Sequence, residues 1–169
     1  LLIACEGPVL NQLMAQSAQL GIGNNVLFVG YLDRKTELPD CYRAANVFVF
    51  SSCTETQGLV LLEAMAQATP VVALAELGTR DVLREGEGAL IAAHDVEDFS
   101  AKTMSLLQRP DTAMQLGARG LEYARGWSAG ALAEKMLDFY QRTIEHALEV
   151  TTRSQQLYEP NACLNASED

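Results

Sequence analysis

The chain has 169 residues, about the size of one domain. Hydrophobic residues make up 49% and charged residues 20%, a balance that excludes a disordered, collagen-like or low-complexity chain and predicts one sizeable core. With 12 Lys and Arg residues against 22 Asp and Glu residues, the formal net charge is −10. Because an acidic surface repels phosphate backbones, the composition argues against a general nucleic-acid-binding protein.

The beginning of the chain is unusual. There is no initiator Met, and the first residues, Leu-Leu-Ile-Ala, are typical of a strand already under way. We therefore expect this sequence to be a piece of a longer protein. No apolar run reaches the roughly 18 residues of a membrane span, and the first residues lack the basic-then-apolar form of a signal peptide.

Cysteine usage indicates the compartment. Cys5, Cys41, Cys53 and Cys163 are irregularly spaced, with no C-x-x-C pair and no nearby cluster of His. This spacing excludes a zinc or thioredoxin-type motif, and a chain of this length does not need a disulfide framework. We expect buried, reduced thiols in a cytoplasmic protein.

Short apolar runs alternate with longer segments of helical pattern in the first part of the chain. The runs are continuous rather than alternating, as is typical of strands buried on both faces, and lie at residues 1–4, 26–29, 47–50, 71–73 and 89–91. Helices are expected near residues 8–20, 39–45, 58–67 and 79–84. This alternation predicts a Rossmann-like α/β fold, an open parallel sheet with helices on both faces.

After residue 91 the pattern becomes helical only. Asp95, with Asp98 three residues on, predicts a capped helix over residues 99–108. Pro110 begins a second helix, over residues 110–125, and Ser128 caps a third.

The last residues differ from the rest of the chain. From about residue 150 the sequence is polar without a clear period. We therefore expect a domain over residues 1–149 and a disordered tail over residues 150–169. His94, an isolated imidazole after the last predicted strand, is expected to be structural or solvent-exposed.

One loop has the features of a ligand site. In an open α/β sheet, ligands bind at the carboxyl ends of the strands, where loops run into helix N-termini. Residues 51–58, Ser-Ser-Cys-Thr-Glu-Thr-Gln-Gly, connect the predicted strand 47–50 to the next helix. Gly58 allows a ligand to approach the backbone closely, and the N–H groups of a first helical turn attract anions. The loop therefore predicts a phosphate site.

Two carboxylates accompany this loop, Glu55 within it and Glu63 in the following helix. A carboxylate beside a phosphate site is unfavourable unless it accepts hydrogen bonds from neutral hydroxyls, which points to a ligand with phosphate and polyol parts, such as a nucleotide sugar. The alternative is a helix-capping Glu55 and a solvated Glu63, as in a non-catalytic flavodoxin-like interaction module. Glycoside hydrolysis is not supported, because it needs two carboxyl groups that face each other across a bond.

Residues 55–66, Glu-Thr-Gln-Gly-Leu-Val-Leu-Leu-Glu-Ala-Met-Ala, with Thr-Pro-Val-Val-Ala at 69–73, resemble the E-x7-E segment of the family 4 retaining glycosyltransferases. Further matches are Glu-Gly-Pro at 6–8, Val-Leu-Phe-Val-Gly-Tyr at 26–31 and Tyr-Arg-Ala-Ala-Asn-Val-Phe-Val-Phe at 42–50. Together, in this order, these matches are specific. The resemblance implies the C-terminal, donor-binding half of a GT-B fold, which consists of two Rossmann-like domains.

The resemblance also implies a reaction, transfer of a sugar from a nucleotide-diphosphate sugar to an acceptor with retention of configuration. Glu55 would be the catalytic-site residue and would hold the sugar hydroxyls. The donor-binding residues that it implies are Gln57, Gly58 and Leu59 at the diphosphate, Glu63 at the ribose, and Gly30, Tyr31 and Leu32 at the base. No metal or other cofactor is implied, because N–H groups and basic side chains neutralise the leaving diphosphate.

The family's basic diphosphate-binding segment and its N-terminal acceptor domain are expected upstream of residue 1. The chain alone is therefore expected to be inactive. Its implied partners are the nucleotide sugar and the acceptor domain of the same longer protein. Peripheral binding of that protein to the inner face of the membrane stays open, as does the alternative of a nucleotide-sugar epimerase with the same fold.

Overall fold

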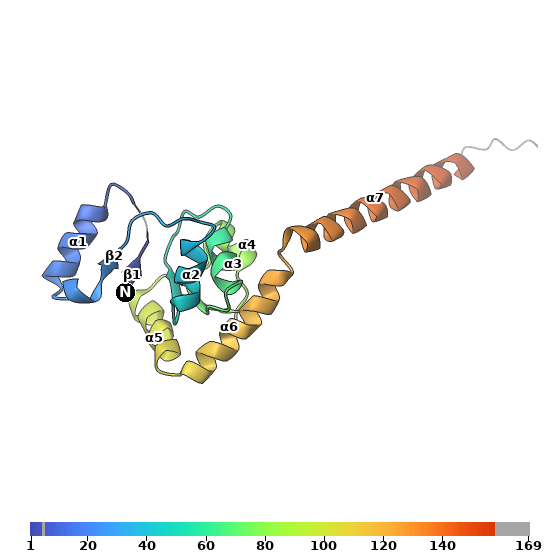
Figure 1. Ribbon diagram of the computed structural model, residues 1–169. Coiled ribbons are helices and arrows are strands. Elements are labelled where there is room, and N and C mark those ends of the chain that lie inside the picture. The colour runs from blue at the N-terminus through green and yellow to red at the C-terminus, as the bar shows by residue number, and fades with distance from the viewer. Residues whose placement is uncertain (5, 158–169) are drawn as a thin grey trace, which may run out of the picture. The chain divides into compact units, whose positions relative to one another are not determined.

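The computed structural model describes residues 1–4 and 6–157, which form an α/β fold (Figure 1). The chain divides into two compact units, Leu1–Arg125 and a second unit from Gly126 onward. The strands are β1 (Leu2–Ile3), β2 (Leu27–Phe28), β3 (Phe48–Phe50), β4 (Val71–Leu74) and β5 (Ala89–Ala92). The helices of the first unit are α1 (Leu10–Gln19), η1 (Gly23–Asn25, a 3-10 helix), α2 (Glu37–Ala44), α3 (Leu59–Met65), α4 (Gly78–Val82), α5 (Val96–Leu107) and α6 (Pro110–Arg125). The second unit contains α7 (Ala129–Leu157).

The element order agrees with the sequence prediction. Each predicted strand has a counterpart that differs by at most one residue at either end, and α6 covers the predicted range 110–125. All strand pairs are parallel. The predicted α/β class with parallel strands is thus confirmed.

The parallel strands form two separate ladders. β1 pairs only with β2, whereas β3, β4 and β5 form a separate three-stranded sheet with β4 in the middle. Within residues 1–4 and 6–157, no strand joins β1 to β3, so the two ladders are not continuous.

The core is built around β4, whose residues Val71, Val72 and Ala73 are completely buried. Val72 packs in one cluster with Leu106 of α5 and Leu116 of α6. Because side chains alternate along a strand, Val71 and Ala73 point to the opposite face, and α3 contacts β4 as well. Helices therefore cover both faces of β4, and full burial of each Val or Leu contributes about 1.5–3 kcal/mol.

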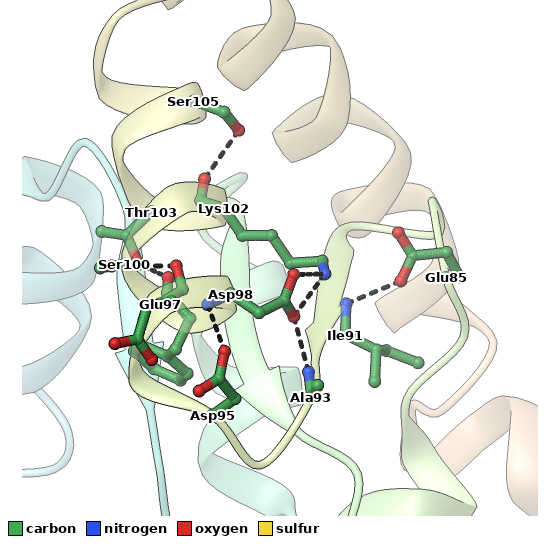
Figure 2. Close-up of polar contacts among 11 residues, drawn as sticks. Glu85, Ile91, Ala93, Asp95, Glu97, Asp98, Ser100, Lys102, Thr103 and Ser105 are labelled. Atoms are coloured by element: carbon green, nitrogen blue, oxygen red, sulfur yellow. Dashed lines mark hydrogen bonds and ion pairs between the residues drawn. The ribbon is translucent and has the colours of Figure 1, made fainter.

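The predicted cap at Asp95 is present, as Figure 2 shows. The Asp95 carboxylate accepts a hydrogen bond from the backbone N–H of Asp98 at 3.0 Å, one turn into α5. The Asp98 carboxylate in turn accepts from the backbone N–H of Ala93 at 2.7 Å and from Lys102 at 2.6 Å. The Lys102 ammonium and the Ala93 N–H lower the pKa of Asp98. These bonds fasten the loop after β5 to the first turn of α5.

The second unit begins with the predicted cap at Ser128, whose hydroxyl accepts a hydrogen bond from the N–H of Ala131 at 3.3 Å. α7 continues to Leu157 and so includes the first residues of the expected tail. The rest of that tail, residues 158–169, lies outside the described residues, as do Cys5 and Cys163. In the described part of the chain, no helix is long and apolar enough to cross a membrane.

Three glycines, Gly117 and Gly120 on α6 and Gly88 before β5, allow α6 to approach its neighbours closely. A Cβ atom at Gly117 would lie 2.0 Å from the carbonyl oxygen of Ala68. A Cβ atom at Gly88, just before β5, would lie 2.3 Å from the Cα of Gly120. Backbone therefore packs directly on backbone at both places, and no side chain fits between.

We predict that Gly117→Ala lowers the free energy of unfolding by about 1–3 kcal/mol, because the added methyl group overpacks a site bounded by backbone. Urea unfolding followed by circular dichroism measures this change. Gly130→Ala in α7 is the matched control, because a Cβ atom there meets nothing within 4 Å. Equal effects of the two substitutions would contradict the predicted close packing.

Candidate functional site

The loop over residues 51–58 leaves β3 and enters α3, as predicted. Gly58 ends it with a φ of +70°, a left-handed conformation that glycine adopts without strain. The backbone N–H of Gly78 donates to the carbonyl oxygen of Glu55 at 3.0 Å. A Cβ atom at Gly78 would lie only 2.0 Å from the carbonyl oxygen of Thr56. The first residue of α4 thus holds the loop in place, a role for Gly78 that the sequence analysis did not detect.

Glu55 closes this loop with its own side chain. Its Oε1 accepts hydrogen bonds from the backbone N–H groups of Gln57 at 2.9 Å and Gly58 at 3.0 Å. These two donors, Gln57 first, lower the pKa of Glu55. α3 itself has no side-chain cap. Glu55 therefore stabilises the loop before the helix. This role differs from the helix cap that the sequence analysis gave as the alternative for Glu55.

Glu63, on α3, is held by two other side chains. The Arg34 guanidinium forms an ion pair with its Oε1, and the Tyr42 hydroxyl lies 3.5 Å from its Oε2. Burial, together with the Glu63 charge, raises the pKa of Tyr42 to about 12. Glu63 is thus a partly buried, paired carboxylate rather than a solvated one, its side chain being 33% exposed.

A pocket of about 220 Å³ lies beside Glu63. Its lining residues are Ala4, Tyr31, Leu32, Arg34, Leu38, Val60 and Glu63. Three of the predicted donor-binding residues, Tyr31, Leu32 and Glu63, are therefore brought together. Gly30 precedes them with a φ of +69°, as a tight turn requires.

Asp33 stabilises the turn that carries Arg34. Its Oδ1 accepts hydrogen bonds from the backbone N–H groups of Lys35 and Thr36, each at 2.9 Å, and from the Thr36 hydroxyl at 2.8 Å. The Thr36 hydroxyl is the main cause of the lowered pKa of Asp33. Arg34 is thus presented to the pocket by an ordered turn.

The predicted site residues form two groups. Glu55, Gln57 and Gly58 make up the closed loop, and Leu59 follows as the first, exposed residue of α3. The pocket with Glu63 is the second group, and none of the loop residues 55–58 lines it. Arg34 and Tyr42 were not predicted, because they lie 29 and 21 residues from Glu63 in the sequence.

The thiols differ from the expectation of buried cysteines. Cys53 is exposed and Cys41 is only half-buried, so the expectation is wrong for both. The Cys53 Sγ lies 3.6 Å from Nε2 of His94, which is therefore not an isolated imidazole. In the described residues, no group of three or more His, Cys, Asp or Glu side chains is placed to hold a metal ion.

Comparison with known proteins identifies the family. The family described as "Glycosyl transferases group 1" matches residues 1–123. The D-inositol 3-phosphate glycosyltransferase 2 of Catenulispora acidiphila is 41% identical over 130 residues, covering 75% of this chain and 30% of that protein. The mannosylfructose-phosphate synthase of Agrobacterium fabrum is 34% identical over 149 residues, covering 85% of this chain and 32% of that protein. The chain belongs to the group 1 glycosyltransferases.

Solved structures agree with this assignment. Sucrose-phosphate synthase from Thermosynechococcus elongatus aligns with a TM-score of 0.69 at 26% identity, covering 86% of this chain and 38% of that one. A TarM variant of S. aureus, in complex with fondaparinux, alpha-GlcNAc-glycerol and UDP, aligns with a TM-score of 0.68 at 26% identity. The alignment covers 81% of this chain and 28% of the TarM chain. The chain thus spans about a third of the length of these relatives. They confirm the predicted family and fold, and support neither the epimerase nor the interaction module.

We predict that the stabilisation by Glu55 depends on pH. A carboxyl group with a lowered pKa stabilises the folded chain above its unfolded pKa, near 4.5, and the effect is lost as the pH falls through the folded pKa. Glu55→Gln should therefore destabilise the chain more at neutral pH than at an acidic pH below 4.5. Urea unfolding at the two pH values measures the difference.

Glu134→Gln, on α7, is the control for this experiment. A stability difference for Glu55→Gln that does not shrink in acid would show that its carboxylate is not bound to the loop N–H groups.

Proposed function

We propose that this chain is the donor-binding domain of a retaining glycosyltransferase, which moves a sugar from a nucleotide-diphosphate sugar to an acceptor. The observation that carries the proposal is the placement of Glu55 and Glu63 at the two ends of one loop-and-helix segment, with Glu63 in a pocket beside Tyr31 and Leu32. Membership of the group 1 glycosyltransferases supports the reaction class. The UDP-bound TarM structure supports a nucleoside diphosphate as part of the donor.

The pocket takes the nucleoside part of the donor. Its volume of about 220 Å³ is below the range of roughly 300–1,000 Å³ that encloses a whole ligand, so it suits one portion of a nucleotide sugar. The Glu63 carboxylate accepts hydrogen bonds from the ribose hydroxyls, and the turn Gly30, Tyr31 and Leu32 meets the base through its backbone. A carboxylate has about four acceptor sites, so Arg34 and Tyr42 leave room for these hydroxyls.

The loop takes the diphosphate and the sugar. The Oε1 atom of Glu55 is engaged by Gln57 and Gly58, and its other oxygen accepts hydrogen bonds from the sugar hydroxyls. The diphosphate lies at the beginning of α3, near the backbone N–H group of Leu59, because the Gly58 N–H already donates to Glu55. Hydrogen-bond donors placed where the leaving diphosphate gains charge stabilise the transition state electrostatically.

The acceptor and the remaining donor contacts come from the rest of a longer protein. Relatives about three times as long as the matched segment support this division. Among the described residues, Cys41 and Cys53 form no disulfide, which supports a reducing, cytoplasmic location.

Titration of the chain with UDP and with GDP tests donor binding. We expect NMR shifts in residues 30–34 and 55–63, and we expect Glu63→Gln to weaken binding about tenfold or more, since it removes a charged acceptor. Glu134→Gln should bind as the parent does. If neither nucleotide shifts any resonance of residues 55–63, the chain is not a donor-binding domain.

The transfer reaction is tested in the longer protein. We expect Glu55→Gln to reduce transferase activity strongly, whereas Glu134→Gln keeps it. Full activity of the Glu55→Gln enzyme would exclude the catalytic-site role of Glu55.

A further inference from the structure

Cys53 and His94 form a polar cluster that the proposed function does not use. Cys53 lies in the loop after β3, and His94 lies in the loop after β5. β3 and β5 flank β4 in the parallel sheet, so their carboxyl ends lie at the same edge. The two side chains meet there, with Sγ 3.6 Å from Nε2, although 41 residues separate them in the sequence.

Hydrogen bonds hold the two loops that contain Cys53 and His94. Ser52 accepts a hydrogen bond from the backbone N–H of Thr54 at 3.3 Å, across Cys53. His94 lies between Ala93 and Asp95, and both of these residues are bonded to Asp98 at the beginning of α5 (Figure 2). The hydrogen bonds within these two loops therefore position the His94 imidazole near the Cys53 thiol.

This geometry suits a nucleophile and its base. A thiol attacks as the thiolate, and a neighbouring imidazole nitrogen can take its proton. The Cys53 thiol has the Ser51 carbonyl oxygen as one acceptor at 3.8 Å; with the ring proton on Nδ1, Nε2 of His94 is a second, nearer acceptor at 3.6 Å. Both side chains are exposed, so a small molecule in solution reaches them.

We propose that His94 activates Cys53 and that small carbon electrophiles modify this chain at Cys53. Nε2 of His94 takes the thiol proton, and the sulfur forms a bond to the electrophilic carbon. The leaving group departs with its bonding electron pair. With iodoacetamide, the carbon–iodine bond breaks, iodide leaves, and the product is a thioether at Cys53.

Modification at this position also affects the proposed donor site, and this consequence rests on the proposed function. Cys53 lies two residues before Glu55, in the loop that Glu55 closes. An added group on the sulfur crowds the sugar and diphosphate part of that loop. Alkylation and donor binding therefore exclude each other.

The reactivity is tested with iodoacetamide and peptide mass spectrometry on the chain. We expect Cys53 to be alkylated faster in the folded chain than in urea, and His94→Gln to lower its rate about tenfold or more. His146→Gln, on α7, should leave the rate unchanged, and circular dichroism shows whether each variant is folded. A Cys53 that reacts no faster folded than unfolded, or at the same rate in folded His94→Gln, overturns the proposal.

Alkylation in the presence of UDP separates this proposal from the proposed function. We expect UDP to slow the reaction of Cys53, and the alkylated chain to lose the NMR shifts that UDP causes. Bound UDP without protection of Cys53 would overturn the exclusion between alkylation and donor binding. A chain that does not bind UDP but shows the His94-dependent rate would contradict the proposed function and support the activated thiol.

Discussion

The close approach of Gly78 to the loop over residues 51–58 is the constraint on which the site depends. The N–H of Gly78 binds the Glu55 carbonyl, and the lack of a side chain lets its backbone lie against Thr56. α4 is itself anchored by the completely buried Thr79, whose hydroxyl donates to the carbonyl of Leu74 at the end of β4. The position of the loop is therefore tied to the central strand of the sheet. Because α3 begins at the end of this loop, the position of Glu63 follows from the same contacts.

The two carboxylates of the site are stabilised in different ways. Backbone N–H groups stabilise the Glu55 carboxylate by hydrogen bonds, whereas Glu63 has a cation, Arg34, and a phenol, Tyr42, as partners. Each carboxylate retains acceptor sites for hydroxyl groups. In a chain with a formal charge of −10, both carboxylates are thus held by hydrogen-bond donors, and Glu63 by a cation as well. This arrangement agrees with a group 1 glycosyltransferase.

Much of the fold and part of the site could be predicted. Continuous apolar runs identified all the strands described here, and the segment from Glu55 to Glu63 identified the family. Gly78, Arg34 and Tyr42 were missed, because their importance lies in contacts with residues distant in the sequence. The division of the strands into two ladders was also not predicted, since hydrophobic pattern identifies strands but not which strands pair. The roles of the individual site residues stay proposals.

The sequence by itself determined the order of strands and helices, the family, and the caps at Asp95 and Ser128. These follow from local periodicity and short-range hydrogen bonding, which a pattern of neighbouring residues contains. Only the tertiary structure decided that Glu55 closes its own loop, that Arg34 pairs with Glu63, and that His94 lies against Cys53. The last two contacts join segments 29 and 41 residues apart. Such contacts depend on the packing of loops at one edge of the sheet, which no local pattern specifies.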